Sequence, residues 1–330
     1  MEFDAVLLVS FGGPERSEDV LPFLDNVLRG KHVPEARKLE VARHYYHFGG
    51  RSPIAAATRE LAAALERELA AVGPRLPVYL GNRNWHPLLP EALERMRRDR
   101  RRRALALVTS AFGSYSGCRQ YQEDIDRARA EVGADAPEVE KLPPFALRPE
   151  FAAIWAERVR AALAAMDRSR LVFTAHSIPL SMARSSPYER QLQAVCARVA
   201  AAAGVDAFRL AYQSRSGPPS QPWLEPSLDA VLEEEARAGA RGVLAAPVGF
   251  LSDHMEVVYD LDCEARARAE ALGLAWSRVA TPGHHPRFAA LLRALVAERA
   301  AGQLPAGTEA CAAACCLASG DSPARPILRN

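Results

Sequence analysis

The sequence has almost no excess charge of either sign. Its 42 lysines and arginines are balanced by 40 aspartates and glutamates, which leaves a formal net charge of +2 over 330 residues. This balance creates no general field that would attract nucleic acid or an anionic membrane. The basic run at residues 97–103, RRDRRRR, has no aromatic residues for base stacking, so we interpret it as the solvated end of a helix.

Long hydrophobic runs are also missing. Residues 1–13, MEFDAVLLVSFGG, contain an apolar run that is too short to cross a bilayer. They have no basic leader, and they end in Gly12 and Gly13 where a secretory signal would have its cleavage site. We therefore predict a cytoplasmic protein. With 49% hydrophobic and 25% charged residues, the chain is of ordinary globular composition and long enough for two domains with their own cores.

Cysteine is scarce, and three of the six cysteines crowd into CAAACC near the C-terminus. In a reducing compartment such a group favours metal binding over disulfides, and adjacent cysteines such as Cys315 and Cys316 rarely bridge each other. The rest of the chain holds Cys118, Cys196 and Cys263. The last two lie in helical patterns, and we interpret them as buried packing residues.

Eight short apolar runs alternate with helical stretches rich in Ala, Glu and Arg. In chain order the runs are AVLLVSF, PVYLGNR, ALALVTSA, PEVEKLP, RLVFTAHS, AFRLAYQS, GVLAAPVGF and AWSRVATP. Parallel strands joined by helical crossovers give this pattern. Because the runs divide four and four about residues 143–149, we predict an α/β fold of two Rossmann-like, doubly wound domains. We expect an N-terminal domain at 1–148, a C-terminal domain with the metal site at 149–305, and a cysteine-bearing extension at 306–330.

Polar side chains stand where two strands of the second half end. RLVFTAHSIP ends its strand at His176, and GVLAAPVGFLSDHME continues to His254 and Glu256. Ligands bind at the carboxyl ends of parallel strands, so we expect His176 and Glu256 to share one cleft. If a helix starts just after Asp253, His254 and Glu256 point in different directions, and one of them supports the other or caps the helix, with Ser252 and Asp253 as further cap candidates.

The chemistry of His176 and Glu256 favours a site that binds a metal or a proton only transiently. Taken singly, a histidine at a strand end is a common hydrogen-bonding core residue and a first-turn glutamate is a common cap. A histidine and a glutamate without a third strong ligand make a poor permanent zinc site, so a transient metal site or a proton-transfer pair fits better. Ser177 beside His176 lacks the G-x-S-x-G elbow, which argues against a serine hydrolase.

Seven ordered segments give the sequence a family resemblance. They are LLVSFGGP, YYHFGGRSPI, GNRNWHP, TSAFGSYSGCRQYQED, FTAHSIPLSM, YQSRSGPPSQPWLEP and GFLSDHMEVVYDLD, spread over most of the chain. With them the chain resembles ferrochelatases, lyases that insert ferrous iron into a porphyrin in haem synthesis. The resemblance implies two Rossmann-like domains around a porphyrin cleft. It is strongest with the actinobacterial type, which uses coproporphyrin III, although protoporphyrin IX stays open as the substrate.

The resemblance also assigns roles to residues. His176 corresponds to the metal-site and proton-accepting histidine and Glu256 to its partner carboxylate, while His254 is expected to stand behind this pair and support it. Metalation strips two protons from pyrrole nitrogens, and a neutral imidazole beside a carboxylate is suited to accept them. The implied porphyrin contacts are Phe11, Arg29, Tyr45, Ser52, Arg83 and Tyr121. Phe11 replaces a tyrosine of some members and cannot ligate iron through a phenol.

Some members of the family hold a [2Fe-2S] cluster, and the resemblance extends to its ligands. Cys311, Cys315 and Cys316 match the C-terminal group, and Cys118 of YSGC matches the internal ligand. Four thiolates are the required number. A zinc site built from the same four cysteines, or incidental thiols in an Ala-rich tail, remain alternatives.

The implied substrates are ferrous iron and a porphyrin, and the implied product is haem, with transient contact with neighbouring haem-pathway enzymes and none with nucleic acid. A non-catalytic haem or iron-sulfur carrier on the same scaffold is the alternative from another class of protein. It predicts binding without turnover.

Overall fold

The computed structural model describes residues 2–30, 33–166, 169–217, 220–309 and 315–317. It contains two four-stranded parallel sheets. The first has the order β2-β1-β3-β4, from β1 (Ala5–Ser10), β2 (Val78–Asn82), β3 (Arg103–Val108) and β4 (Glu138–Lys141). The second repeats this order as β6-β5-β7-β8, from β5 (Ser169–His176), β6 (Phe208–Gln213), β7 (Gly242–Ala246) and β8 (Ala275–Arg278). All eight predicted strands are present, which confirms the predicted fold class.

Helices cover both faces of each sheet, as an all-parallel sheet requires. Their bounds are α1 (Val20–Leu28), α2 (Glu35–His47), α3 (Pro53–Val72), α4 (Leu89–Arg98), α5 (Gln120–Val132), α6 (Pro149–Leu163), α7 (Leu180–Arg184), α8 (Tyr188–Ala203), α9 (Leu228–Arg237), α10 (Met255–Val257), α11 (Arg266–Ala271) and α12 (Pro286–Ala300). Short 3₁₀ turns lie at η1 (Ser17–Asp19) and η4 (Pro282–His284), and π-helical segments at η2 (Tyr115–Arg119) and η3 (Val258–Ala265). None of the helices in the described ranges is long and apolar enough to span a membrane.

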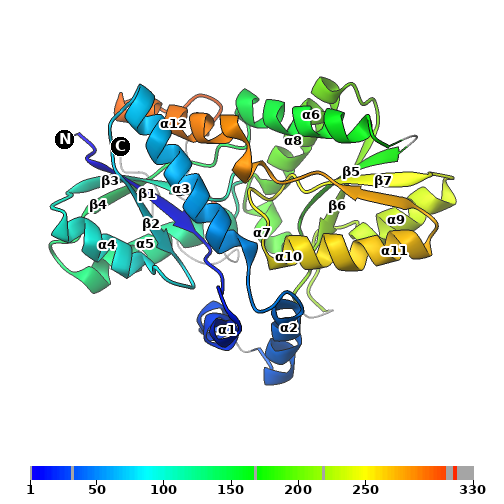
Figure 1. The fold of residues 1–330 in the computed structure, drawn as a ribbon, viewed down its shortest axis with the longest axis horizontal. Coiled ribbons are helices and arrows are strands. Elements are labelled where there is room, and N and C mark those ends of the chain that lie inside the picture. Colours follow the sequence, from blue (N-terminus) through cyan, green and yellow to red (C-terminus); the bar gives the residue numbers. More distant parts are fainter. Residues whose placement is uncertain (1, 31–32, 167–168, 218–219, 310–314, 318–330) are drawn as a thin grey trace.

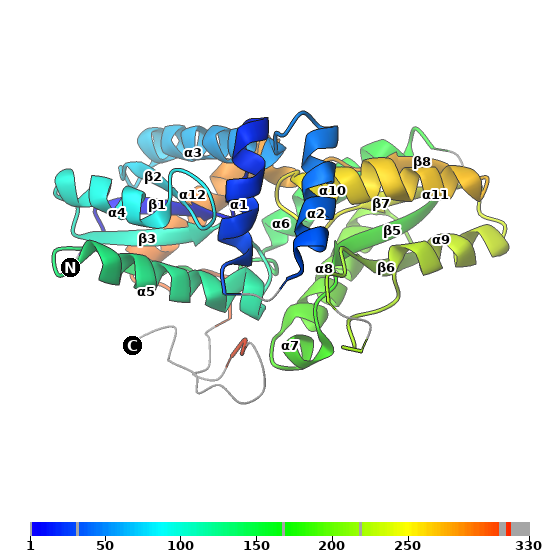
Figure 2. The ribbon, with the colours of Figure 1, turned by 90° about the horizontal axis from the view of Figure 1, so that it is seen from below.

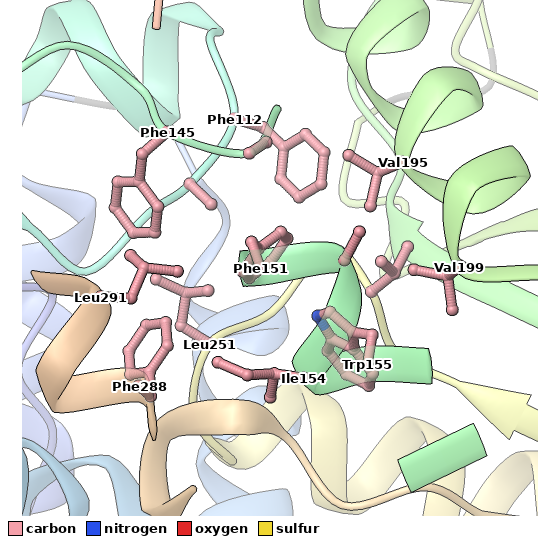
Figure 3. Close-up of a cluster of buried hydrophobic side chains, with 14 of the residues drawn as sticks. Phe112, Phe145, Phe151, Ile154, Trp155, Val195, Val199, Leu251, Phe288 and Leu291 are labelled. Carbon is pink, nitrogen blue, oxygen red and sulfur yellow. The ribbon is translucent and has the colours of Figure 1, made fainter. Parts of the chain in front are cut away.

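The two sheets share one continuous hydrophobic core. Phe145 and Leu291 meet Phe288 on the side of the first sheet, and Phe151 and Trp155 continue the core toward the second (Figure 3). Helix α12, which follows the last strand of the second sheet, packs against both α3 and α6. It therefore joins the two halves from one side (Figure 1). The domain limits at 148 and 305 stay predictions.

A pair of helices, α1 and α2, stands away from both sheets and has its own small core (Figures 1 and 2). Val20, Phe23 and Leu24 of α1 pack with Ala42 of α2. The sequence patterns gave no sign that this pair extends to the second half of the molecule. It does so at α2, where the ring of His44 stacks on that of Tyr259 in η3, with centroids 3.8 Å apart and planes 9° from parallel.

Candidate active site

The strand order of the second sheet determines where the predicted pair lies. Strand β5 has β6 on one side and β7 on the other, so the chain reverses its winding direction between β5 and β7. Such a switch point leaves a crevice at the carboxyl ends of the strands. His176 is the last residue of β5, and Glu256 follows β7 in the short helix α10. The structure thus brings the two residues together at the carboxyl edge of the second sheet, where the switch point predicts a crevice.

The two side chains face each other. His176 Nε2 lies 3.6 Å from Glu256 Oε2, and the side chains are 30% and 51% exposed, so both remain open to a ligand. A first-row divalent cation held at about 2.1 Å by each atom fits a pair with this spacing. Among the residues that the structure describes, no group of three or more His, Cys, Asp or Glu side chains is arranged to hold a metal ion. The pair itself offers two protein ligands.

The tautomer of His176 follows from its second hydrogen bond. Nδ1 lies 2.5 Å from the carbonyl oxygen of Ser177, and because a carbonyl can only accept, Nδ1 carries the proton. The neutral ring therefore presents the Nε2 lone pair toward Glu256, ready for a metal ion or a proton. Tyr188 donates its hydroxyl to the His176 carbonyl at 3.0 Å and steadies the end of the strand.

The two histidines of the crevice have opposite electrostatic surroundings. Burial acts to lower the pKa of His176, but the Glu256 carboxylate, the Ser177 carbonyl and the charge of Asp260 outweigh it and raise the pKa above its ordinary value. For His254, burial lowers the pKa and the neighbouring His176 adds to the effect. His176 is thus the more basic of the two, while His254 packs its ring edge-on against Phe250.

One detail of the predicted capping is wrong. Helix α10 begins after His254, which occupies the N-cap position, and neither Ser252 nor Asp253 caps it. The Asp253 carboxylate is held instead by Arg278 and Thr281. The guanidinium of Arg278 satisfies this carboxylate better than the helix end would. Because Arg278 is distant in the chain, no local sequence pattern indicates the contact.

The proposed porphyrin contacts fall into two sets. Arg83 lies over the Tyr121 ring at 4.4 Å and within 5.9 Å of the Phe11 ring, and it forms a buried ion pair with Asp124. Phe11 and Tyr45 both pack edge-on against Phe23. Burial and the negative charge of Glu256 raise the pKa of Tyr45, which places this phenol within electrostatic reach of the candidate metal site.

The other two predicted contacts lie apart from this aromatic set. Ser52 is 6% exposed and donates its backbone N–H to the Pro14 carbonyl ahead of α3. Arg29 is exposed at the end of α1 and donates to Asn26 at 2.6 Å. Their roles toward a porphyrin stay predictions.

Comparisons with known proteins bear on this arrangement. The family model described as Ferrochelatase matches residues 3–300. The chain is 50% identical over 318 residues to the coproporphyrin III ferrochelatase of Nocardia farcinica, covering 92% of this chain and 90% of the relative. It is 47% identical to the ferrochelatase of Rhodopirellula baltica, with 99% and 98% covered, and 51% identical to the coproporphyrin III ferrochelatase of Mycobacterium tuberculosis, with 93% and 89% covered.

The chain belongs to the ferrochelatase family. Membership confirms the sequence-based prediction of a ferrochelatase, a lyase of haem synthesis that takes ferrous iron and a porphyrin. Among solved structures, SirB from Bacillus subtilis with Fe³⁺ matches with a TM-score of 0.55 at 15% identity, over 92% of this chain and 99% of that one. CbiX, described as the terminal enzyme of sirohaem biosynthesis in denitrifying bacteria, matches with a TM-score of 0.50 at 16% identity, over 89% and 98%. These two show that the ferrochelatase chain shares a chelatase-like fold.

Sequence reasoning missed Asp260, which lies beyond Glu256 along η3. Ser214, in a left-handed backbone conformation at φ 61°, donates its hydroxyl to Asp260, and Gln213 Nε2 lies 3.5 Å from the same oxygen. Burial raises the pKa of Asp260 to about 7, with Glu256 adding to the rise and Ser214 opposing it. The four-residue spacing from Glu256 was the available signal, but it aligns side chains only once the segment is known to be helical.

The raised pKa of Asp260 predicts a pH-dependent cost to folding. The folded-state pKa of Asp260 lies above the ordinary value of 3.8. The stability that the protonated Asp260 carboxyl contributes is therefore complete below about pH 4 and is lost as the pH rises through 7. Asp260→Asn should therefore raise the free energy of unfolding at pH 8 by on the order of 2 kcal/mol, allowing for solvent screening. Urea unfolding at pH 5 and pH 8 measures this. An equal gain at both pH values would contradict the assignment.

Proposed function

We propose that this chain inserts Fe²⁺ into coproporphyrin III, with His176 and Glu256 as the metal and proton site. The observation that carries the proposal is the 3.6 Å approach of His176 Nε2 to Glu256 Oε2 at the switch point of the second sheet. Two relatives with 50% and 51% sequence identity to the chain are named coproporphyrin III ferrochelatases, which supports coproporphyrin III as the porphyrin.

The geometry suits each step of metalation. The Nε2 lone pair and the facing carboxylate receive the ferrous ion, and two protein ligands hold it weakly enough to release it into the macrocycle. Four porphyrin nitrogens take the metal, and the two that carry N–H protons lose them. His176, whose pKa is raised mainly by Glu256 against the opposing effect of burial, accepts such a proton and forms an ion pair with the carboxylate. Glu256, half exposed, connects this pair with solvent.

The choice of porphyrin is tested by a direct comparison. Coproporphyrin III carries additional propionates, which need cationic or hydrogen-bond donor groups at the mouth of the cleft. The full chain is incubated anaerobically with Fe²⁺ and either coproporphyrin III or protoporphyrin IX, and loss of the free-porphyrin absorption bands is followed. We expect kcat/KM at least about 10-fold higher with coproporphyrin III, equivalent to about 1.4 kcal/mol of transition-state binding. Equal values, or a preference for protoporphyrin IX, would overturn the substrate assignment, and binding of both without conversion would indicate a carrier.

We further propose that Cys118, Cys311, Cys315 and Cys316 hold a [2Fe-2S] cluster. Cys311 lies outside the described residues, so the fit is judged on the other three. Cys118 is 2% exposed in η2, and Lys141 Nζ lies 3.2 Å from its Sγ. It is held in a single π-helical turn, Tyr115–Arg119.

The tail returns to the region of Cys118. Arg119, the next residue in the chain, donates to the Cys315 carbonyl at 3.1 Å, and the N–H of Cys316 donates to the Ser185 carbonyl at 2.9 Å. Cys316 is 2% exposed, so its thiol faces the protein. These contacts bring the tail to the region of Cys118, and this proximity is the support for a shared cluster, because the thiols of the three described cysteines are not gathered into a metal-binding group in this structure. When bound, the cluster would supply iron–thiolate bonds that cross-link the first domain and the tail.

A further inference from the structure

Arg278, the last residue of β8, binds two carboxylates at once. Its guanidinium donates to both oxygens of Asp253, each at 3.0 Å, and to both oxygens of Asp262, at 2.7 and 2.8 Å. The Arg278 side chain is 12% exposed, and Thr281 donates to Asp253 from the same side at 2.9 Å. A planar guanidinium that makes bidentate hydrogen bonds to two carboxylates fixes their positions as well as neutralising their charge.

The two carboxylates lie on either side of Glu256 in the sequence. Asp253 comes three residues before it, in the loop that leaves β7, and Asp262 comes six residues after it, in η3. The Glu256 side chain is 51% exposed and is carried by the short helix α10 in the middle of this segment. Its position therefore depends on the backbone of the 253–262 segment.

The scaffold behind this segment is rigid. β8 pairs with β7 through the register of Arg278 with Ala245, and β7 pairs with β5, which ends in His176. Arg278 thus anchors both ends of the Glu256 segment to the sheet that carries His176. The segment itself includes a π-helix, a rare form that persists where surrounding contacts hold it.

Loss of the guanidinium would leave Asp253 and Asp262 facing each other. Two carboxylates that share one cation repel when it is removed, and partial burial strengthens the repulsion. The loop and η3 would then move apart, and the distance between Glu256 and His176 would change. A lysine at position 278 offers one point charge and cannot make bidentate hydrogen bonds to both carboxylates.

We propose that Arg278 is a positioning residue for metalation, which sets where the Glu256 carboxylate stands relative to His176 by holding Asp253 and Asp262. The inference rests on the proposed iron insertion at His176 and Glu256. Arg278 acts on the pair through these two carboxylates, which hold its guanidinium.

The test compares Arg278→Met, Arg278→Lys and Asp262→Asn with a matched control, Arg209→Met. Arg209 is also a strand residue of the second sheet, and it also pairs with two carboxylates, those of Glu234 and Glu235, away from Glu256. For each full-length variant, the dissociation constant for coproporphyrin III is measured by fluorescence, and kcat and the KM for Fe²⁺ by anaerobic insertion.

We expect Arg278→Met to lower kcat/KM for Fe²⁺ by about 10- to 100-fold, as for other residues that orient metal ligands. Porphyrin binding should stay within about 2-fold, Arg278→Lys should recover part of the loss, and Arg209→Met should match the wild type. Wild-type kcat and KM in folded Arg278→Met would overturn the inference, as would a parallel loss of porphyrin binding. If Arg278→Met does not fold, Asp262→Asn decides, since it frees only the η3 end and should give an intermediate loss. An inactive wild type would contradict the proposed function, and is thereby distinguished from a failure of Arg278 alone.

Discussion

His176→Ala should abolish iron insertion while leaving folding and porphyrin binding close to wild type. The ring supplies the Nε2 atom that faces Glu256 at 3.6 Å, and the neighbouring imidazole of His254 is a poorer replacement because burial lowers its pKa. Loss of a positioned proton acceptor typically costs 10²- to 10⁴-fold, and His176 is also a proposed metal ligand, so turnover should fall by at least about 1000-fold.

The same assay separates this result from a general loss of structure. His176 is partly exposed at a strand end, so its removal should shift the urea midpoint little, and coproporphyrin III should still quench protein fluorescence. Glu256→Gln serves as the matched companion, because it keeps the shape of the side chain and removes the charge. It should slow turnover with porphyrin binding intact. Near-normal turnover in His176→Ala would exclude the histidine from the reaction.

Cys118→Ser should remove the cluster and loosen the tail. The proposed cluster needs four thiolates, and Cys118 is the one that the first domain supplies. Purified wild-type protein should be reddish-brown, whereas Cys118→Ser should lose the visible absorption, the acid-labile sulfide and the bound iron together. Because ligation provides ordering free energy to a metal-bound segment, limited proteolysis should also cut residues 306–330 faster in the variant.

Cys196→Ser is the control for this experiment. Cys196 is fully buried in α8, and burial raises the pKa of its thiol, so it stays protonated and unsuited to bind iron. Its replacement should leave the cluster in place. A full complement of iron and sulfide in Cys118→Ser would show that the internal ligand is wrong. Wild-type protein that contains neither after anaerobic purification would show that the cluster is wrong.

The parts of the fold that sequence predicts well are those with local causes. Each buried parallel strand is a short apolar run, and all eight runs became strands. Likewise, His176 and Glu256 could be placed in one crevice because strand ends of a parallel sheet converge. The basic run at 97–103 begins at the end of α4, where Arg97 and Arg98 pair with Glu94 in solvent.

The features that sequence could not predict depend on distant partners. The π-helix η3 has the same apolar pattern as an ordinary helix, so Asp260 could not be placed beside Ser214. Nothing near Asp253 in the sequence indicates that Arg278 holds it in place of a helix cap. The stacking of His44 on Tyr259 joins segments that are far apart in the chain, and its cause is the packing of α2 against the second half.

The most direct test of the central claim is to locate the metal itself. Crystals of the full chain soaked with Co²⁺, a redox-stable substitute for Fe²⁺, can be measured at the cobalt absorption edge for anomalous scattering. We predict a peak within about 2.3 Å of both His176 Nε2 and Glu256 Oε2, and its loss in His176→Ala crystals. A peak that persists in His176→Ala, or cobalt bound elsewhere with none between these two atoms, would contradict the claim that this pair receives the iron.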